Sequence, residues 1–394
     1  MLLGLVGKPS CGKSTFFKAA TLAEVLIAAY PFATIKPNTG VGYVKVECID
    51  KEFNVQCNPR VGKCVNHQRF VPVEIMDVAG LVEGASEGKG LGNQFLDDLR
   101  QADVFMHIID VSGTTDAEGK VTENYNPVQD VDMLENELDS WYVGLLNKVW
   151  KTFSRTISTQ HDVNFAEAVA KQFSGLKIDE DMVKSTVRKT GLDTENAVKW
   201  GEDDLRKFAR ALRDVSKPMI IVANKIDMPN GKKNYETLRD IFSDRMIIPC
   251  SADSELALRE ASKAGLIDYI PGESSFEIKK ELNDKQKQAL DKIKKNVLDV
   301  YGNTGVQQVL NSAVFDLLKY MAIFPAGAKL ADKDGNVLPD CFLLSEGSTA
   351  LDFAYSLHTD IGDNFIKAID ARTKRAVGKD YKLKHRDALE IATK

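Results

Sequence analysis

The sequence predicts an α/β protein in which a mostly parallel sheet is interrupted by a helical insertion and followed by a smaller module of strands and turns. Three observations support this prediction. An apolar stretch at residues 2–6 leads through a glycine-rich loop into a helix, an order typical of nucleotide-binding α/β folds. Strands and helices then alternate until Gly113, where a long helical stretch precedes the next strand at residues 218–223. From about Tyr320 onward, short strands and turns predominate.

The glycine-rich loop matches the phosphate-binding pattern G-x-x-x-x-G-K-[ST] without a gap. Gly7 and Gly12 allow successive backbone N–H groups to face phosphate oxygens at the positive end of the following helix. Lys13 would bridge the β- and γ-phosphates, and Ser14 would ligate Mg²⁺. The predicted nucleotide-binding loop consists of Gly7, Lys8, Pro9, Ser10, Cys11, Gly12, Lys13, Ser14 and Thr15.

Two later segments are typical of loops that sense a third phosphate. Residues 30–38 contain two prolines and Thr34, whose hydroxyl would complete the Mg²⁺ sphere while its N–H contacts the γ-phosphate. A strand at residues 70–76 ends in D-V-A-G, where Asp77 would hold Mg²⁺ through water and the Gly80 N–H would meet the γ-phosphate. The predicted catalytic residues are therefore Lys13, Thr34 and Gly80, and the predicted metal-binding residues are Ser14, Thr34 and Asp77.

The base-recognition signal is the quartet N-K-x-D directly after the strand at residues 218–223. Asp227 can accept two hydrogen bonds from guanine N1–H and N2–H₂, which predicts discrimination against adenine of about 10⁴-fold. Asn224 would orient the base and the phosphate-binding loop, while Lys225 would lie over the ring. A later S-A-x-x-E sequence would bring the Ala252 N–H to guanine O6. The predicted base-binding residues are Asn224, Lys225, Asp227, Ser251 and Ala252.

Five motifs in this order predict a P-loop GTPase domain with GTP as substrate and Mg²⁺ as cofactor. Leu81 stands where many GTPases carry a glutamine that orients the attacking water. Because leucine makes no hydrogen bond, we expect slow intrinsic hydrolysis unless another residue, an ion or a partner positions the water. A P-loop kinase is disfavoured, since such kinases lack the switch threonine and the N-K-x-D quartet.

The interruption of the sheet pattern has helical periodicity. Apolar residues recur at alternating intervals of three and four across residues 130–153, which predicts one long amphipathic helix. Residues 164–173, 179–190 and 202–212 are candidate partners for its apolar face. We therefore expect an antiparallel helical hairpin or small bundle, either simply packed or acting as a contact arm for a large partner.

Composition excludes several classes. A net charge of -5 argues against a surface that grips nucleic acid all over. Lys8 and Lys13 interrupt the first apolar stretch, and no apolar run reaches the roughly 20 residues that span a bilayer, so we expect a cytoplasmic protein without a membrane partner. The six cysteines are expected to be reduced thiols. Cys57, Cys64 and His67 lie near one another without a C-x-x-C pair, so a hairpin loop is favoured there over a metal site.

At this level the chain resembles the Obg-related GTPases, and within them the YchF (Ola-type) family in an archaeal-like form. The resemblance rests on Y-P-F-A-T at residues 30–34, D-V-A-G-L-V at residues 77–82 and G-K-G-L-G at residues 88–92. It implies a GTPase domain interrupted by a helical arm, with a hydrophobic residue replacing the catalytic glutamine. Many relatives have lost N-K-x-D and lean towards ATP, whereas this chain keeps it. Ser10 replaces an asparagine that suits K⁺ in relatives.

The C-terminal residues resemble a TGS domain, a ubiquitin-like β-grasp module, through L-P-D-C-F-L-L at residues 338–344 and G-S-T-A at residues 347–350. We expect a turn at residues 334–336, a helix at 350–358 and a closing strand at 382–391. Basic side chains crowd one stretch and could meet RNA phosphates or form a merely solvated face. They are Arg372, Lys374, Arg375, Lys379, Lys382, Lys384 and Arg386.

The sequence thus predicts a regulatory GTPase, most simply a monomer, that acts on ribosomes or RNA through the TGS domain and the helical arm. The alternative is an ATP-hydrolysing or dual-specificity stress or metabolic NTPase whose TGS domain binds a protein or small ligand. We expect the GTPase domain in two parts, residues 1–125 and residues 214–318, the second of which includes connector helices. The helical insertion is expected at residues 126–213 and the TGS domain at residues 319–394.

Overall fold

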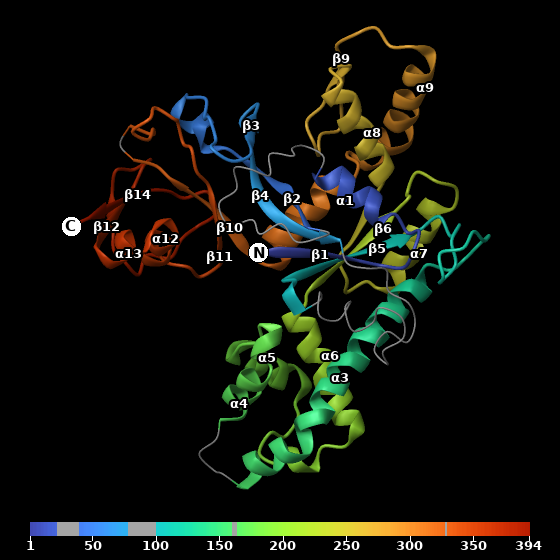
Figure 1. Cartoon of the computed structure of the whole chain (residues 1–394), viewed down its shortest axis with the longest axis vertical. Helices are drawn as coiled ribbons and strands as arrows, with labels where there is room; N and C mark the ends of the chain where they lie inside the picture. Colours follow the sequence, from blue (N-terminus) through green and yellow to red (C-terminus); the bar gives the residue numbers. More distant parts are fainter. Residues whose placement is uncertain (22–38, 78–99, 160–163, 328) are drawn as a thin grey trace. The chain divides into compact units, whose positions relative to one another are not determined.

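The chain folds into two compact units (Figure 1). The computed structural model describes residues 1–21, 39–77, 100–159, 164–327 and 329–394. The first unit comprises Met1–Ala19, Ile75–Leu258 and Leu282–Val306. The second comprises Ala20–Glu74, Arg259–Glu281 and Gln307–Lys394. Each unit is therefore assembled from segments that are far apart in the sequence, and the predicted domain boundaries stay predictions.

A parallel sheet forms the centre of the first unit. Strand β1 (Leu2–Val6) pairs with β5 (Val104–Asp110), β5 pairs with β6 (Met219–Asn224), and β6 pairs with β7 (Ile247–Cys250), all in parallel. Their carboxyl ends meet at one edge, where Asp110 lies opposite Asn224 and Asn224 opposite Cys250. Ligands of open α/β sheets bind outside this edge, so the fold brings the predicted motifs to the expected place.

Every residue of β5 is buried, which explains its mostly apolar sequence. His107 lies within this strand, and only 1% of its surface is exposed. Burial lowers the pKa of His107 to about 3, with Lys13 and Lys8 acting in the same direction. The imidazole is therefore neutral at physiological pH.

Helices complete the first unit around this sheet. They are α1 (Lys13–Thr21), α3 (Val128–Thr159), α4 (Phe165–Gln172), α5 (Glu180–Thr190), α6 (Glu202–Ser216), α7 (Gly231–Ile241), α8 (Ala252–Lys263), α9 (Asp284–Ile293) and α10 (Asp299–Tyr301). The last residues of α1 and of α8 belong to the second unit. The short turns η3 (Ser174–Leu176), η4 (Ala197–Lys199) and η5 (Lys294–Leu298) join them.

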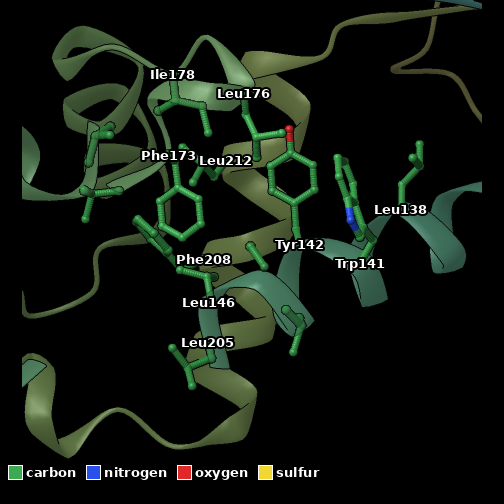
Figure 2. Close-up of a cluster of buried hydrophobic side chains, with 14 of the residues drawn as sticks. Leu138, Trp141, Tyr142, Leu146, Phe173, Leu176, Ile178, Leu205, Phe208 and Leu212 are labelled. Carbon is green, nitrogen blue, oxygen red and sulfur yellow. The ribbon is translucent and has the colours of Figure 1, made fainter. Parts of the chain in front are cut away.

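The predicted helical insertion is a small bundle. Helix α3 leaves the sheet after β5, and α6 returns beside it to β6, while α4 and α5 pack alongside (Figure 1). Figure 2 shows the shared core, in which Tyr142 and Leu146 of α3 face Phe208 and Leu212 of α6. The Tyr142 hydroxyl also lies 2.9 Å from the Ser216 hydroxyl. The long helix extends to Thr159, beyond the predicted end at residue 153.

The C-terminal part of the second unit is a mixed sheet with a helix packed against it, as expected for a β-grasp module. Strand order is β11 (Phe342–Ser345), β10 (Tyr320–Pro325), β14 (Ala388–Thr393), β12 (Phe365–Asp370), β13 (Ala376–Val377). Only the central pair, β10 and β14, is parallel among these strands. Helix α12 (Ala350–Leu357) buries Phe353 in the same core as Ile323 and Leu389, and α13 (Thr359–Asp363) follows it.

Two C-terminal predictions can be compared with the backbone. The turn at residues 334–336 is confirmed, since the Gly335 N–H donates to the Asp332 carbonyl and Ala331 bridges Val337. The closing strand is wrong at its start, because β14 begins only at Ala388. Before it, the Lys384 N–H donates to the Asp387 carboxylate and Arg386 has a φ of 69°, so this segment turns instead of extending.

The rest of the second unit surrounds an irregular hairpin. Strand β2 (Thr39–Glu47) is followed by the turn η1 (Ile49–Phe53), then β3 (Lys63–Val65) and β4 (Gln68–Asp77), which pair antiparallel. Asn66 and His67 both have positive φ, the signature of a two-residue type I′ turn. The unit also contains β8 (Ile267–Asp268), β9 (Glu277–Ile278), α11 (Val306–Asn311), which begins at the end of the first unit, and η6 (Ser312–Leu317).

Within the described part of the chain, no helix combines the length and apolarity that a bilayer-spanning segment requires.

Candidate nucleotide site

The phosphate-binding loop joins β1 to α1. Its packing at Gly7 and Gly12 leaves no room for a side chain. Gly7 has a φ of 148°, and a Cβ there would lie 2.4 Å from the Ile108 carbonyl oxygen. Gly12 has a φ of 99°, and a Cβ there would lie 2.2 Å from the Asn224 amide nitrogen. Both positions therefore require glycine, because any side chain would collide with β5 or with the base-recognition quartet.

The Lys13 ammonium group is held over this loop. Its Nζ donates to the Gly7 carbonyl at 2.9 Å and to the Lys8 carbonyl at 3.0 Å. The side chain is buried, so its charge is poorly solvated. A buried ammonium beside a turn of backbone N–H groups provides a strongly attractive place for phosphate oxygens.

The structure brings two of the predicted Mg²⁺ ligands together. The Ser14 hydroxyl donates to the Asp77 carboxylate at 3.4 Å. Burial raises the pKa of Asp77, whereas the Lys13 charge and the Ser14 hydroxyl act in the opposite direction. A hydroxyl and a carboxylate fit the oxygen ligands that Mg²⁺ prefers alongside nucleotide phosphates and water. When bound, Mg²⁺ would neutralise charge on the phosphates, and these two residues would hold it in place.

Lys8 belongs to the loop, but its side chain turns away from a phosphate site. Its Nζ donates to the Thr115 carbonyl at 2.7 Å, lies 2.9 Å from the Asp130 carboxylate and lies 3.8 Å from the centre of the Tyr125 ring. Both charged groups of the pair are almost fully buried. Only the Lys8 backbone can serve phosphate binding, and its side chain instead ties the loop to the start of α3.

Breaking this buried pair is expected to destabilise the first unit. Asp130→Asn would leave the Lys8 charge buried without a counter-ion, which costs about 3–5 kcal/mol. Urea unfolding without nucleotide, followed by tryptophan fluorescence, measures the change. Asp132→Asn, an exposed neighbour on the same helix, is the matched control. Equal unfolding midpoints for the two variants would contradict the assignment.

Asn224 connects three of the predicted motifs. Its amide nitrogen donates to the Cys11 carbonyl at 3.0 Å, and its amide oxygen accepts the Ala252 N–H at 3.1 Å. The residue is buried at the carboxyl end of β6. One side chain therefore fixes the phosphate-binding loop against the S-A-x-x-E segment, the orienting role that the sequence predicts for it.

Lys225 is held by a residue that the sequence analysis did not select. Its Nζ donates to the Asp110 carboxylate at 2.7 Å and to the Ser10 carbonyl at 3.1 Å. Burial opposes ionisation of Asp110, yet hydrogen bonds from Lys225, Ser112 and Thr115 hold its pKa below the usual value. The available signal was position, since Asp110 ends the central strand at the ligand-binding edge.

The Asp227 carboxylate is half-buried next to this framework. Among the described residues, none donates a hydrogen bond or forms an ion pair with it. Ser251 is occupied locally, because its hydroxyl lies 2.8 Å from the Ser254 hydroxyl and its N–H donates to the Thr304 carbonyl. Within the described part of the chain, both Asp227 carboxylate oxygens therefore remain open to a hydrogen-bond donor.

The structure does not address the two switch segments. Thr34, Gly80 and Leu81 lie outside the described residues, so the catalytic role predicted for Thr34 and Gly80 and the metal-binding role predicted for Thr34 stay predictions. Of the predicted site, the structure gathers Lys13, Ser14, Asp77, Asn224, Lys225 and Ala252 around one sheet edge.

Comparisons with known proteins match three successive parts of the chain. The family description "50S ribosome-binding GTPase" matches residues 2–148, "Obg-like GTPase YGR210-like, G4 motif-containing domain" matches residues 222–327, and "TGS domain" matches residues 326–393. These matches cover in turn the phosphate-binding loop, the N-K-x-D quartet, and the C-terminal sheet except for β10.

Relatives match along the whole chain. A GTP-binding protein of Methanocaldococcus jannaschii is 50% identical, with 100% of this chain and 99% of the relative covered. A ribosome-binding ATPase YchF of Buchnera aphidicola is 28% identical, with 93% and 86% covered. The crystal structure of a GTP-binding protein from Pyrococcus horikoshii is 39% identical, covers 100% of both chains and superposes with a TM-score of 0.79. The chain therefore belongs to the YchF-type family of Obg-related GTPases.

Proposed function

We propose that the protein is a Mg²⁺-dependent guanine-nucleotide switch that prefers GTP to ATP, hydrolyses GTP slowly and acts on ribosomes or RNA in the cytoplasm, most simply as a monomer. The observation that carries this proposal is the base-recognition framework. Asn224 is fixed between Cys11 and Ala252, and the Asp227 carboxylate next to it has no partner among the described residues. Guanine supplies the two N–H donors that this carboxylate requires, whereas adenine does not.

The proposed slow hydrolysis rests on the sequence. Leu81 cannot orient the attacking water, so turnover would depend on a partner or ion that supplies this function. A switch that hydrolyses slowly stays in its GTP form until it meets that partner. This behaviour suits regulation better than metabolism.

The ribosome is the favoured partner because of the relatives. One is named a ribosome-binding ATPase, and the family description over residues 2–148 names a ribosome-binding GTPase. Loss of the γ-phosphate would free Thr34 and Gly80, so a partner that contacts the ordered switches would bind one nucleotide state better. We expect co-sedimentation with ribosomes to be stronger with a non-hydrolysable GTP analogue than with GDP. Equal sedimentation in both states would contradict a switch.

Fewer basic side chains of the TGS domain are available to bind RNA phosphates than the sequence suggests. Arg372 and Arg386 both bind Glu52, and Arg386 also lies 3.1 Å from Glu47, so these two cations are already paired. Lys382 donates to the Gly347 carbonyl. Among the described residues, no acidic side chain pairs with the remaining members, which are Lys374, Arg375, Lys379 and Lys384.

Charge reversal should test this remaining surface. The double variant Arg375→Glu, Lys379→Glu is expected to weaken RNA or ribosome binding and to lower the slope of log affinity against log salt by about one per lost phosphate contact. GTP hydrolysis by the isolated protein should not change. Lys333→Glu, an exposed lysine in the turn before β11, serves as control. Unchanged affinity and salt slope in the double variant would remove this surface from the interface.

The competing proposal is an ATP-hydrolysing or dual-specificity NTPase, which the printed name of the Buchnera relative favours. It predicts comparable affinities for ATP and GTP.

A further inference from the structure

Four potential metal ligands meet in the second unit, away from the nucleotide motifs. They are the Cys48, Cys57 and Cys64 sulfurs and the Asp50 carboxylate, whose ligand atoms all lie within 4.8 Å of one another. Cys48 follows β2, Asp50 lies in η1, Cys57 lies in the next loop and Cys64 lies in β3. From the sequence, a plain hairpin was favoured over a metal site because Cys57, Cys64 and His67 lie near one another without a C-x-x-C pair.

The spacing within this cluster suits a shared ion better than a disulfide. The Cys48 and Cys57 sulfurs are 3.5 Å apart, and the Cys64 sulfur is 3.6 Å from Asp50 Oδ2. A disulfide would require about 2.05 Å. A tetrahedral zinc ion bound at about 2.3 Å from each thiolate would place the sulfurs about 3.8 Å apart. The observed distances are therefore close to the edges of a zinc tetrahedron.

Neighbouring groups orient these ligands in the way metal sites require. Asp50 Oδ1 lies 2.9 Å from His67 Nδ1, and the Cys57 N–H donates to Asp50 Oδ2 at 3.0 Å. The buried Arg69 guanidinium lies 3.5 Å from the Cys57 sulfur. Ligating carboxylates in metal sites are themselves hydrogen-bonded, and a nearby cation offsets the negative charge of several thiolates. His67 and Arg69 thus form an outer layer around the four ligands.

The segment that carries these ligands contains little regular structure and buries few side chains. Residues 48–67, which we call the cysteine lobe, contain only the short elements η1 and β3. Between residues 51 and 67, all of which the structure describes, Cys57 is the only fully buried side chain. Segments that cannot bury apolar surface commonly rely on a metal or disulfide for stability.

We propose that Cys48, Asp50, Cys57 and Cys64 bind one structural Zn²⁺, with His67 as the hydrogen-bond partner of the ligating carboxylate. Three soft thiolates and one carboxylate within 4.8 Å of one another select zinc over Mg²⁺ or Ca²⁺, which prefer oxygen ligands. Four protein ligands close the site, and Cys48 and Asp50 are fully buried. The ion therefore has a structural role and leaves no open position for chemistry.

The cysteine lobe contacts the C-terminal part of the same unit, so binding of the ion would also affect these contacts. The Asn58 N–H donates to the Val337 carbonyl at 3.0 Å, and the Arg60 N–H donates to the Pro339 carbonyl at 3.1 Å. The Arg60 side chain also binds Asp332 and Asp340. Zinc would fix the lobe in the shape that makes these contacts, and its loss would loosen them.

Metal analysis of the full chain tests the proposal directly. Protein produced with added zinc and purified without chelator is expected to contain about one zinc per chain. Apoprotein titrated with Co²⁺ should develop thiolate-to-metal charge-transfer absorption together with the intense visible bands of a tetrahedral site. Hydrogen exchange at the Asn58 and Arg60 amides should be faster in the apoprotein than in the zinc-loaded protein.

Variants assign the ligands. Cys64→Ser and Asp50→Asn should each lose zinc, and His67→Gln should keep the site but weaken it about 10–100-fold. Cys341→Ser, a cysteine of the same unit outside the cluster, should retain full zinc. Binding of a fluorescent GDP analogue to the motifs of the first unit confirms that each variant is folded.

Three results would overturn the proposal. The first is unmodified protein with neither zinc nor a cobalt charge-transfer band. The second is a native mass two hydrogens below that of the reduced chain, which shows a disulfide. The third is full zinc retention in both Cys64→Ser and Asp50→Asn. Zinc lost in His67→Gln but kept in Asp50→Asn would overturn the choice of Asp50 as the fourth ligand.

Discussion

Asp227→Asn is expected to weaken GTP and GDP binding by about 10²–10⁴-fold, because two hydrogen bonds to a charged acceptor are worth about 1.5–3 kcal/mol each. The side-chain amide of the new asparagine places its N–H₂ group opposite the exocyclic N–H₂ group of guanine. Two hydrogen-bond donors then face each other, and neither has an acceptor. Xanthine carries a carbonyl oxygen at that position and accepts from the new amide. The variant should therefore bind xanthosine nucleotides better than guanosine nucleotides, which competition against a fluorescent GDP analogue measures.

Asp240→Asn is the matched control for this experiment, since Asp240 is an exposed carboxylate on α7 of the same unit. Its guanine affinity should equal that of the unmodified protein. If Asp227→Asn kept full guanine affinity and gained nothing for xanthine, the assignment of Asp227 to the base would be wrong.

Lys13→Ala is expected to reduce GTP turnover on the order of 10³-fold. The Lys13 ammonium is buried and held over the loop by the Gly7 and Lys8 carbonyls, so a phosphate group bound there meets its charge without much screening by water. Removing it takes away stabilisation of charge that develops during phosphoryl transfer. Release of inorganic phosphate under single-turnover conditions measures the loss.

Lys18→Ala, an exposed lysine farther along α1, should turn over GTP normally. Ser14→Ala should raise the Mg²⁺ concentration needed for turnover, because the Ser14 hydroxyl lies beside Asp77 and we propose that both residues bind Mg²⁺. Normal Mg²⁺-dependent turnover in both Lys13→Ala and Ser14→Ala would mean that the phosphate site lies elsewhere.

Local signals in the sequence were sufficient for most of the fold. The loop from Gly7 to Thr15 needs a strand before it and a helix after it, and the structure provides β1 and α1. The long amphipathic helix was predictable because its apolar face recurs with helical spacing, although its end at Thr159 was not. The start of β14 was predicted too early because Arg386 adopts a positive φ. Arginine rarely adopts this turn conformation, so the sequence did not predict it.

Local sequence patterns could not predict contacts between residues that are far apart in the chain. Lys8 looked like part of a phosphate site, yet its partner Asp130 lies on a helix far along the chain. Asp110 belongs to none of the sequence motifs, although it forms an ion pair with Lys225. Cys48 and Asp50 join Cys57 and Cys64 only after β2, η1 and β3 have folded together, so their spacing gave no metal signature.

The most direct test of the central claim, guanine specificity, is the affinity of the unmodified protein for GTP and for ATP in the presence of Mg²⁺. Isothermal titration of nucleotide-free protein with each triphosphate analogue gives both values. The account predicts that the GTP analogue binds about 10⁴-fold more tightly, since ATP would leave the Asp227 carboxylate without its two donors. Equal affinities for the two analogues would contradict it and would favour the dual-specificity NTPase instead.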